Sequence, residues 1–177
     1  MKTKLLGGIL GMVITLALAT PAIADNSKTV YAKSAPTAAA TVAYLSQEHR
    51  AARSNLAGDM KGFEPSLYRG KWYDKKWESS RKCIMQRESR FSYRAANKSS
   101  SARGAYQFLD SNWRDGLVWM MLKESRKNGD GLSGEIKTLF HKPIHNWSRY
   151  YQDRAFYTAW QHGKGKHHWY YPGHSCY

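Results

Sequence analysis

The sequence is poor in acidic residues, in cysteine and in long apolar runs. Its 177 residues include 13 aspartates and glutamates against 28 lysines and arginines, and two cysteines. The N-terminal apolar run, residues 5–19, is shorter than the roughly 20 residues that a transmembrane helix needs. No segment repeats at the spacing of solenoid proteins, which argues against a repeat architecture. We therefore expect a basic, non-repetitive protein whose partners carry negative charge.

The N-terminus has the three-part layout of a secretory signal peptide. Lys2 and Lys4 precede the apolar run, and the small-residue pattern Ala22-Ile23-Ala24 follows it. This layout predicts a signal peptide over residues 1–24 that is cleaved after Ala24, with an uncleaved anchor as the alternative. The expected location is extracellular or periplasmic and associated with the cell wall, without stable membrane insertion after cleavage.

The charge of the exported chain narrows the range of partners. The signal peptide carries two lysines and no acid, so the mature chain keeps a formal charge of +13. An exported protein rarely meets nucleic acid as its cognate ligand, and we expect no nucleic-acid partner. The polyanions outside a cell are cell-wall polymers and phospholipid surfaces. A basic surface that serves solubility alone is the competing interpretation.

Cys83 and Cys176 are the two cysteines of the chain. Export places both in an oxidising compartment, where disulfides form and persist. Because two cysteines allow one intramolecular pairing, we predict a disulfide between them rather than a thiol nucleophile. This bond would tie the end of the chain to the segment just before Glu88.

Composition divides the mature chain into two parts. Residues 25–66 are rich in Ala, Ser and Lys and have few large apolar side chains, which predicts a linker with at most one marginal helix near residues 41–55. All seven tryptophans lie between Trp72 and Trp169. A packed domain is therefore expected over residues 67–177, and we expect it to be a monomer.

The packed domain has a mainly helical pattern. Apolar spacing predicts a helix over residues 73–89, and residues 90–108 lack a helical period, which favours turns and a small hairpin. The predicted fold class is α+β and predominantly α, with a small irregular or β section. Further helices are expected from a cap at Ser111 to the stop at Asn128-Gly129, over residues 133–140, and from Ser148 to Trp160.

The tripeptide Glu-Ser-Arg occurs twice, at Glu88 and at Glu124. Glu124 lies among Lys123, Arg126 and Lys127, which predicts a solvated, ionised surface carboxylate. Glu88 follows apolar Ile84 by one helical turn and precedes an aromatic loop. Apolar surroundings favour the protonated form of a carboxyl group, which a general acid needs. Of the two acids, Glu88 is the candidate catalyst.

The residues around Glu88 carry a resemblance to a known family. The stretch CIMQRESRFSYRAANKSSSARGAYQFLDSNW, from Cys83 to Trp113, has Glu-Ser at a helix end, a Tyr-Arg-Ala-x-Asn loop, Gly-x-x-Gln-Phe and then a Trp. It resembles the transglycosylase-like domains of the lysozyme superfamily, including soluble lytic transglycosylases and resuscitation-promoting factors. The resemblance implies a lysozyme-like domain over most of residues 72–177, and it does not cover the linker.

The resemblance also implies roles for individual residues. Glu88 would be the catalytic acid, and Ser89 would orient the substrate or the carboxyl group. Gln107 matches the sugar-contacting glutamine of the motif, while Tyr93 and Asn97 match positions that line the cleft. Flat apolar faces for sugar rings could come from Tyr93, Tyr106, Trp113 and Trp160, with packing in the core as the favoured interpretation for Trp113. The later Ala-Tyr-Asn element of the family is matched only by Ala159-Trp160-Gln161, which leaves the role of Trp160 open.

Glycosidic-bond cleavage usually employs two carboxylates. Asp110 more plausibly caps or charges the start of a helix, and Asp153 more plausibly pairs with Arg149 or Arg154. A single-acid scheme fits better and is the one that the family implies, with Glu88 acting on the β-1,4 bond between N-acetylmuramic acid and N-acetylglucosamine. We therefore expect a lytic transglycosylase whose partners are peptidoglycan glycan strands and anionic wall polymers. A hydrolytic muramidase and a catalytically silent, basic wall-binding protein are the alternatives.

No cofactor is expected, and the histidines do not predict a metal site. His141 and His145 have the i, i+4 spacing of helical metal ligands, but Pro143 between them breaks the helix that this spacing requires. The histidines of the C-terminal tail follow no regular ligand pattern.

Overall fold

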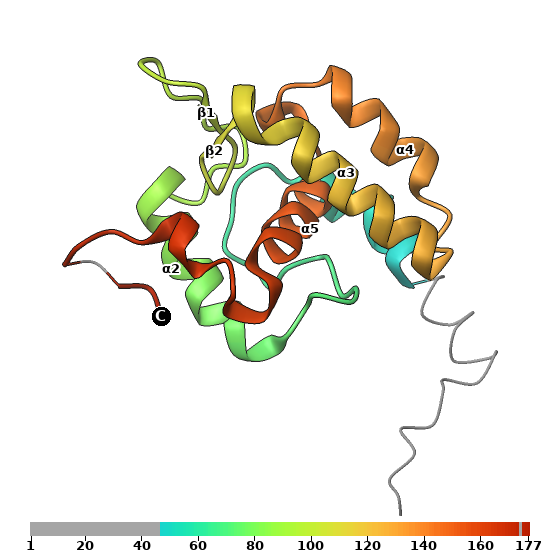
Figure 1. Cartoon of the computed structure of the whole chain (residues 1–177), viewed down its shortest axis with the longest axis horizontal. Coiled ribbons are helices and arrows are strands. Elements are labelled where there is room, and N and C mark those ends of the chain that lie inside the picture. Colours follow the sequence, from blue (N-terminus) through green and yellow to red (C-terminus); the bar gives the residue numbers. More distant parts are fainter. Residues whose placement is uncertain (1–46, 174) are drawn as a thin grey trace, which may run out of the picture. The chain divides into compact units, whose positions relative to one another are not determined.

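The computed structural model describes residues 47–173 and 175–177. The predicted signal peptide and the first part of the predicted linker lie outside the described residues. All the described residues belong to one compact unit. Its elements, shown in Figure 1, are α2 (Glu78–Ser89), β1 (Ala102–Arg103), β2 (Phe108–Leu109), α3 (Asp110–Asn128), α4 (Ser133–Thr138) and α5 (Arg149–Trp160), and residues 47–52 are also helical.

Short 3-10 segments connect these elements. They are η1 (Asn55–Gly58), η2 (Lys75–Trp77), η3 (Leu139–His141), η4 (Ile144–Asn146), η5 (Gln161–Gly163) and η6 (Lys166–Trp169). The predicted class is confirmed at this level, because the structure is predominantly α with one small antiparallel sheet of β1 and β2.

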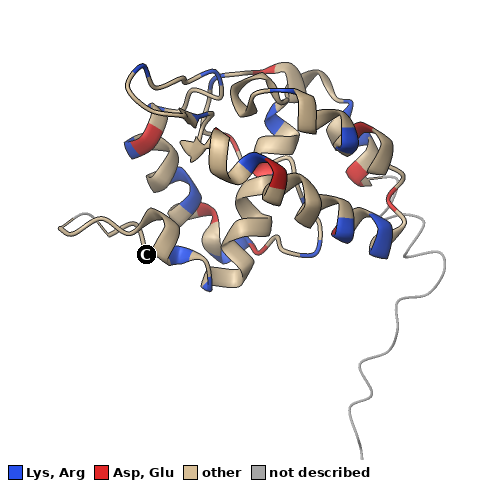
Figure 2. Ribbon diagram, turned by 45° about the horizontal axis from the view of Figure 1, so that its top comes forward, with Lys and Arg blue, Asp and Glu red and all other residues tan. Residues whose placement is uncertain are grey.

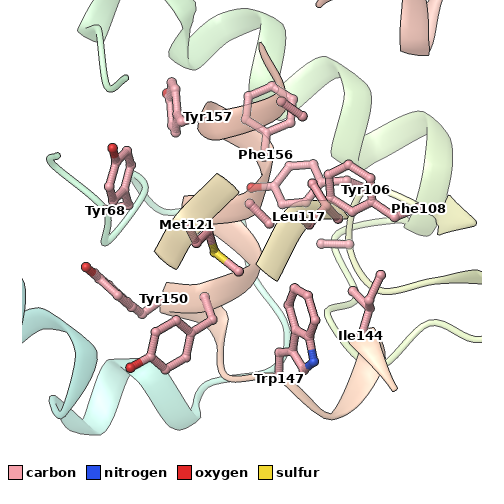
Figure 3. Packing of buried hydrophobic residues seen from close by; sticks show 14 of the residues in the cluster. Tyr68, Tyr106, Phe108, Leu117, Met121, Ile144, Trp147, Tyr150, Phe156 and Tyr157 are labelled. Atoms are coloured by element: carbon pink, nitrogen blue, oxygen red, sulfur yellow. The ribbon is translucent and has the colours of Figure 1, made fainter. Parts of the chain in front are cut away.

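The helix α5 forms the centre of the fold. Every residue of α5 is buried, and Figure 1 shows it between α2 and α3. Aromatic side chains supply most of its packing surface, and Phe156 stacks on Tyr106 with 4.6 Å between ring centroids. Figure 3 shows these two rings beside Phe108, with Leu117 and Met121 of α3 nearby. A helix that buries its whole circumference must also pair its charged residues, because an unpaired buried charge is costly.

The turn between β1 and β2 requires glycine at one position. In the antiparallel register Ala102 pairs with Leu109 and Arg103 with Phe108. Gly104 opens the turn at φ +78°, and a Cβ at this position would lie 2.4 Å from Oε1 of Gln152. Any other residue would therefore both strain the backbone and push the hairpin away from α5.

For α2 and α3, the predicted helix ends agree with the structure better than the predicted helix starts. The helix α2 ends at Ser89 as expected, but it begins at Glu78, after η2, rather than at residue 73. Gly129, at φ +62°, closes α3 as expected. Ser111 is not the cap of α3, because the helix already begins at Asp110.

The predicted boundary at residue 67 is wrong, because residues 47–66 pack as part of the domain. Ala52 and Ala57 belong to the core cluster. The buried Glu48 accepts hydrogen bonds from the backbone N–H of Arg69 at 3.0 Å and from the hydroxyl of Tyr150 at 2.8 Å. Small alanines and one buried carboxylate hold this segment, which explains why its composition suggested a linker.

Candidate active site at the end of α2

Glu88 lies in the last turn of α2, where the chain reverses sharply. Arg90 and Phe91 both adopt left-handed backbone angles, at φ 51° and 65°. Their N–H groups donate to the carbonyls of Gln86 and Met85, which closes the helix. Two consecutive non-glycine residues in this region cost roughly 1–3 kcal/mol each, a type of strain that clusters at functional sites.

The surroundings of Glu88 differ from those that the sequence predicted. Its side chain is 26% exposed, and its Oε1 accepts hydrogen bonds from Nε and Nη2 of Arg87 at 3.0 and 2.8 Å. Ile84, which was expected to bury it, is itself fully buried in the core one turn earlier. Glu88 is therefore a partly exposed carboxylate paired with its neighbouring guanidinium, and the predicted apolar enclosure is wrong.

Ser89 does not orient the carboxyl group of Glu88. Its hydroxyl donates instead to the carbonyl of Met85, one turn back in the same helix, at 3.1 Å. A contact between Ser89 and substrate stays a prediction.

Tyr93 and Tyr106 are core residues rather than cleft residues. Both side chains are buried, and their hydroxyls donate to Oδ1 of Asp153 at 2.7 and 2.6 Å. Burial, followed by the charge of Asp153, raises the pKa of both tyrosines well above the ordinary value, so both phenols stay protonated as donors. Arg81 completes this buried network at 3.5 Å from Asp153. The predicted ring stacking on sugars is corrected for both tyrosines.

Together with the buried network, Gln152 fixes the loop after α2 against the hairpin turn. Its Oε1 accepts from the N–H of Ala105 at 2.9 Å, and its Nε2 donates to the carbonyl of Tyr93 at 3.0 Å. Gln107 leaves that turn at φ 50° and is partly exposed, with its amide donating to the carbonyl of Gly104 at 2.9 Å. The turn that carries Gln107 therefore has a fixed position relative to the loop that follows Glu88.

Asn97 lies on the exposed loop before β1. Its Oδ1 accepts hydrogen bonds from the backbone N–H and the hydroxyl of Ser99 at 2.8 and 2.9 Å. This arrangement shapes the loop locally and leaves the amide nitrogen of Asn97 facing an exposed surface.

Trp169 is a site residue that the sequence reasoning missed. Its Nε1 donates to the carbonyl of Tyr106 at 3.0 Å, and its own carbonyl accepts from Nη2 of Arg87 at 2.7 Å. Trp169 thus connects the guanidinium of Arg87, which holds Glu88, with Tyr106, the residue before Gln107. The predicted Cys83 pairing was the usable signal, because it returns the C-terminal segment to α2 one turn before Arg87.

The disulfide prediction is confirmed. Cys83 and Cys176 are bonded, with 5.5 Å between their Cα atoms. A pocket of about 250 Å³ lies beside the bond and is lined by Gln86, Arg87 and Ser175 together with the two cysteines.

The aromatic edge nearest to the hairpin is formed by Trp113 and His168. Their rings meet edge-on at 4.3 Å, Trp113 is partly exposed and His168 is exposed. Trp160, in contrast, is fully buried and packs against Phe156 and Trp77, so its predicted role as a sugar platform is wrong. Trp113, for which the sequence favoured a core role, packs against the core but stays partly exposed.

The other carboxylates considered from the sequence have structural partners. Asp153 is fully buried in the tyrosine network and also accepts from the N–H of Leu67 at 3.1 Å. Asp110 accepts from the N–H of Ile144 at 2.9 Å and pairs with Arg114 at 3.2 Å. Asp153 is thus closed off from solvent, and both carboxylate oxygens of Asp110 are engaged by protein partners, so neither is placed as a nucleophile.

Glu124 is buried, which contradicts the prediction of a surface charge. It accepts hydrogen bonds from the hydroxyl of Tyr68 and from the N–H of Lys71, and it pairs with Nε of Arg154 at 3.3 Å. The neighbouring cations of α3 point outward while Glu124 points inward. Its role is structural.

The described part of the chain contains neither a metal-binding cluster nor a membrane-spanning helix. No group of three or more His, Cys, Asp or Glu side chains among the described residues is arranged to hold a metal ion. None of the helices in residues 47–177, apart from the undescribed position 174, is long and apolar enough to span a membrane.

Comparisons with known proteins return no relatives. No protein-family model, no curated protein and no solved structure matches the chain.

Proposed function

We propose that the protein is a secreted lytic transglycosylase of lysozyme-like fold that cleaves the β-1,4 bond between N-acetylmuramic acid and N-acetylglucosamine in peptidoglycan. The observation that carries the proposal is the partly exposed carboxylate of Glu88 at a helix end, linked through Arg87 and Trp169 to the turn that bears Gln107. The order of these residues along the chain is also that of the family it resembles.

In the proposed mechanism, Glu88 acts twice. It first protonates the leaving glycosidic oxygen as a general acid, and it then removes the proton of the muramoyl 6-hydroxyl, which attacks C1 and closes the 1,6-anhydro ring. The acetamide of the substrate can stabilise C1 in the meantime. A single acid suffices for this sequence, which agrees with the structural engagement of Asp110 and Asp153.

The ion pair between Glu88 and Arg87 must open before Glu88 can act on the substrate. A carboxylate that is held by a guanidinium must give up this partner and take up a proton from solvent before it can act as the general acid. Because Arg87 also binds the carbonyl of Trp169, the guanidinium has a second acceptor on which to rest when Glu88 is engaged. We infer that substrate binding releases Arg87 from Glu88 while its hydrogen bond to the carbonyl of Trp169 is kept.

The same ion pair favours one competing function, a catalytically silent wall-binding protein. In that case Arg87 and Glu88 would form a permanent surface pair, and binding would depend on the basic surface and on exposed aromatic rings such as Trp119. A muramidase, in which water replaces the 6-hydroxyl as the attacking group, would use the same residues and differ only in its product.

The deciding experiment digests purified peptidoglycan with the mature wild-type protein, Glu88→Gln and Asp115→Asn, and identifies the released fragments by mass spectrometry. Asp115 is a matched control because it is an exposed helical acid that pairs with the arginine just before it, Arg114, at 3.6 Å. We expect anhydromuramoyl products from the wild type and from Asp115→Asn, and none from Glu88→Gln.

Each other outcome assigns a different function. Products with a free reducing end, lost in Glu88→Gln, would identify a muramidase. Binding of peptidoglycan without any released fragment from the wild type would identify the silent module. Equal release by all three proteins would remove Glu88 from the mechanism.

A further inference from the structure

A basic and aromatic surface lies on α3, away from Glu88. Its first part is the Trp72 pocket, of about 370 Å³, whose lining includes Trp72, Lys71, Lys123, Lys127 and the acid Glu124. The ammonium of Lys71 lies 4.2 Å from the centroid of that ring, which places a cation over an aromatic face. The pocket therefore offers positive charge and a flat apolar surface together.

An adjoining cavity repeats this chemistry. The Trp119 pocket, of about 410 Å³, is lined by Trp119, Met120, Lys123 and Arg126. It shares Met120 and Lys123 with the Trp72 pocket, so the two are neighbours along the outer side of α3. Trp119 is 58% exposed, which leaves its ring accessible to a ligand. Each pocket thus combines one tryptophan with at least two cations.

The lysines of this surface, Lys71, Lys123 and Lys127, have no salt-bridge partner among the described residues. Figure 2 shows Lys and Arg recurring over the last turns of α3. Like charges at i, i+4, as in Lys123 and Lys127, repel each other on a helix surface. A bound anion would remove this repulsion.

Helix stability alone does not explain the cluster. Cations in the last turn of α3, Arg126 and Lys127, do interact favourably with the helix dipole. Lys71, however, comes from the segment before η2 and converges on the same pocket as Trp72. The acid at the inner side of the pocket, Glu124, is already paired with Arg154, so the lysines face outward without a counter-charge of their own.

We propose that the Trp72 and Trp119 pockets bind successive units of an anionic polyol-phosphate polymer of the cell wall. The lysines would bind the phosphodiester groups as point charges, and the tryptophans would contact the carbon skeleton of the polyol or its sugar substituents. Two adjacent pockets of like chemistry suit a repeating polymer better than a single small anion. The proposal rests on the proposed function for its setting, since an exported wall enzyme meets this polymer beside its substrate.

The surface is separate from the candidate active site. The hairpin leads directly into α3 at Asp110, and Lys123 lies 13 residues further along the helix, or about 20 Å at 1.5 Å per residue. Polymer and glycan strand could therefore be bound at the same time.

The test measures binding of the mature protein to purified poly(glycerol phosphate) by isothermal titration calorimetry. The pocket variant combines Lys71→Gln, Lys123→Gln and Lys127→Gln. The matched control removes the same charge from three other exposed lysines, with Lys75→Gln, Lys137→Gln and Lys164→Gln. We expect the pocket variant to lose roughly ten-fold or more in affinity, and the control to stay within about two-fold of wild type.

Two further measurements keep this proposal distinct from the catalytic one. Glu88→Gln should bind the polymer as the wild type does, and the pocket variant should cleave polymer-free peptidoglycan as the wild type does. A protein that cleaves nothing but shows the expected binding pattern would contradict the catalytic proposal alone.

Three results would overturn the polymer site. The first is an equal loss of affinity in the pocket variant and the matched control, which would indicate non-specific attraction to net charge. The second is loss of polymer binding in Glu88→Gln but not in the pocket variant. The third is tighter binding to phosphatidylglycerol vesicles than to the polymer, abolished in the pocket variant, which would assign the pockets to a membrane surface.

Discussion

The two copies of Glu-Ser-Arg occupy contrasting places in the same fold. Glu88 ends α2, is partly exposed and pairs with the adjacent Arg87. Glu124 lies inside α3, is buried and joins Tyr68, Arg154 and the backbone of Lys71. Their serines differ as well, since Ser89 bonds to its own helix and Ser125 donates to the side chain of Asp130.

This contrast shows that a short motif acquires its role from what lies opposite it. Charged neighbours in sequence suggested that Glu124 is solvated, yet α-helical periodicity places it on the face of Leu117 and Met121, which are fully buried. Glu88 continues the face of Arg81 and Ile84, but the helix ends there and the chain turns away, so its carboxylate reaches the surface. The predictions below test this division between a chemical role and a structural role.

The largest expected effect is on catalysis by Glu88→Gln. Loss of the proton donor should lower the rate of peptidoglycan cleavage by about 10²- to 10⁴-fold, the usual contribution of a general acid or base. Thermal unfolding should stay close to wild type, because the side chain is partly exposed and pairs only with groups near the surface. Initial rates of fragment release, with Asp115→Asn as control, check this. If Glu88→Gln were inactive only because it unfolds, Glu88 would have a structural role like that of Glu124.

Glu124→Gln should affect stability instead. Removing one partner of a buried ion pair leaves Arg154 with only part of its counter-charge, from Asp130 at 2.9 Å. We expect a loss of roughly 3 kcal/mol in the free energy of unfolding. Urea denaturation followed by circular dichroism measures it. A midpoint equal to that of Asp115→Asn would return Glu124 to the surface role that its sequence neighbours suggested.

Removal of the disulfide should have an effect on stability of similar size. The Cys83→Ser, Cys176→Ser double variant opens a bond between residues 93 positions apart, and loss of a native disulfide typically costs about 2–5 kcal/mol. The disulfide ties the C-terminal segment, which contains Trp169, to α2 and makes no link to α3. Activity should therefore decline in the double variant because Trp169 loses its position, while the buried cluster around Glu124 stays folded. Denaturation of oxidised and reduced wild-type protein provides the matched measurement, and identical midpoints would contradict it.

The smallest expected effect is a pH dependence from His168. Burial, followed by the neighbouring charge of His167, lowers the pKa of His168 below its ordinary value. The unfolded chain therefore binds the proton more readily than the folded chain, and stability falls as pH drops through the ordinary histidine range. His168→Gln should lose less stability than wild type between about pH 7.5 and 5.5, by about 1 °C in melting temperature. A larger loss of stability in His168→Gln than in wild type would contradict the predicted direction of the pH dependence.

The parts of the fold that depend on local signals could be predicted from the sequence. The end of α2, the glycine stop of α3, the small hairpin and the disulfide all follow from helical period, turn residues or cysteine count. Residues 47–66 could not be assigned in this way. Their attachment depends on Glu48 reaching Tyr150 and Arg69, contacts that no local pattern encodes.

The site was predictable only in outline. The position of Glu88 at a helix end and of Gln107 in a hairpin turn agrees with the sequence expectation. The depth of each side chain does not follow from a motif, because Tyr93, Tyr106 and Trp160 have aromatic rings that suit a cleft and a core equally well. Burial of Arg81, Arg149 and Arg154 was equally hidden, since arginine is buried only where carboxylates such as Asp153 and Glu124 meet it.

The most direct test compares Glu88→Gln and Glu124→Gln for cleavage rate per folded molecule. The rate is measured on purified peptidoglycan, and the folded fraction at the assay temperature is measured by circular dichroism. We predict that Glu88→Gln is folded and inactive, whereas Glu124→Gln is less stable but cleaves at the wild-type rate once corrected for its folded fraction. An active Glu88→Gln, or a fully folded and inactive Glu124→Gln, would contradict the assignment of chemistry to Glu88.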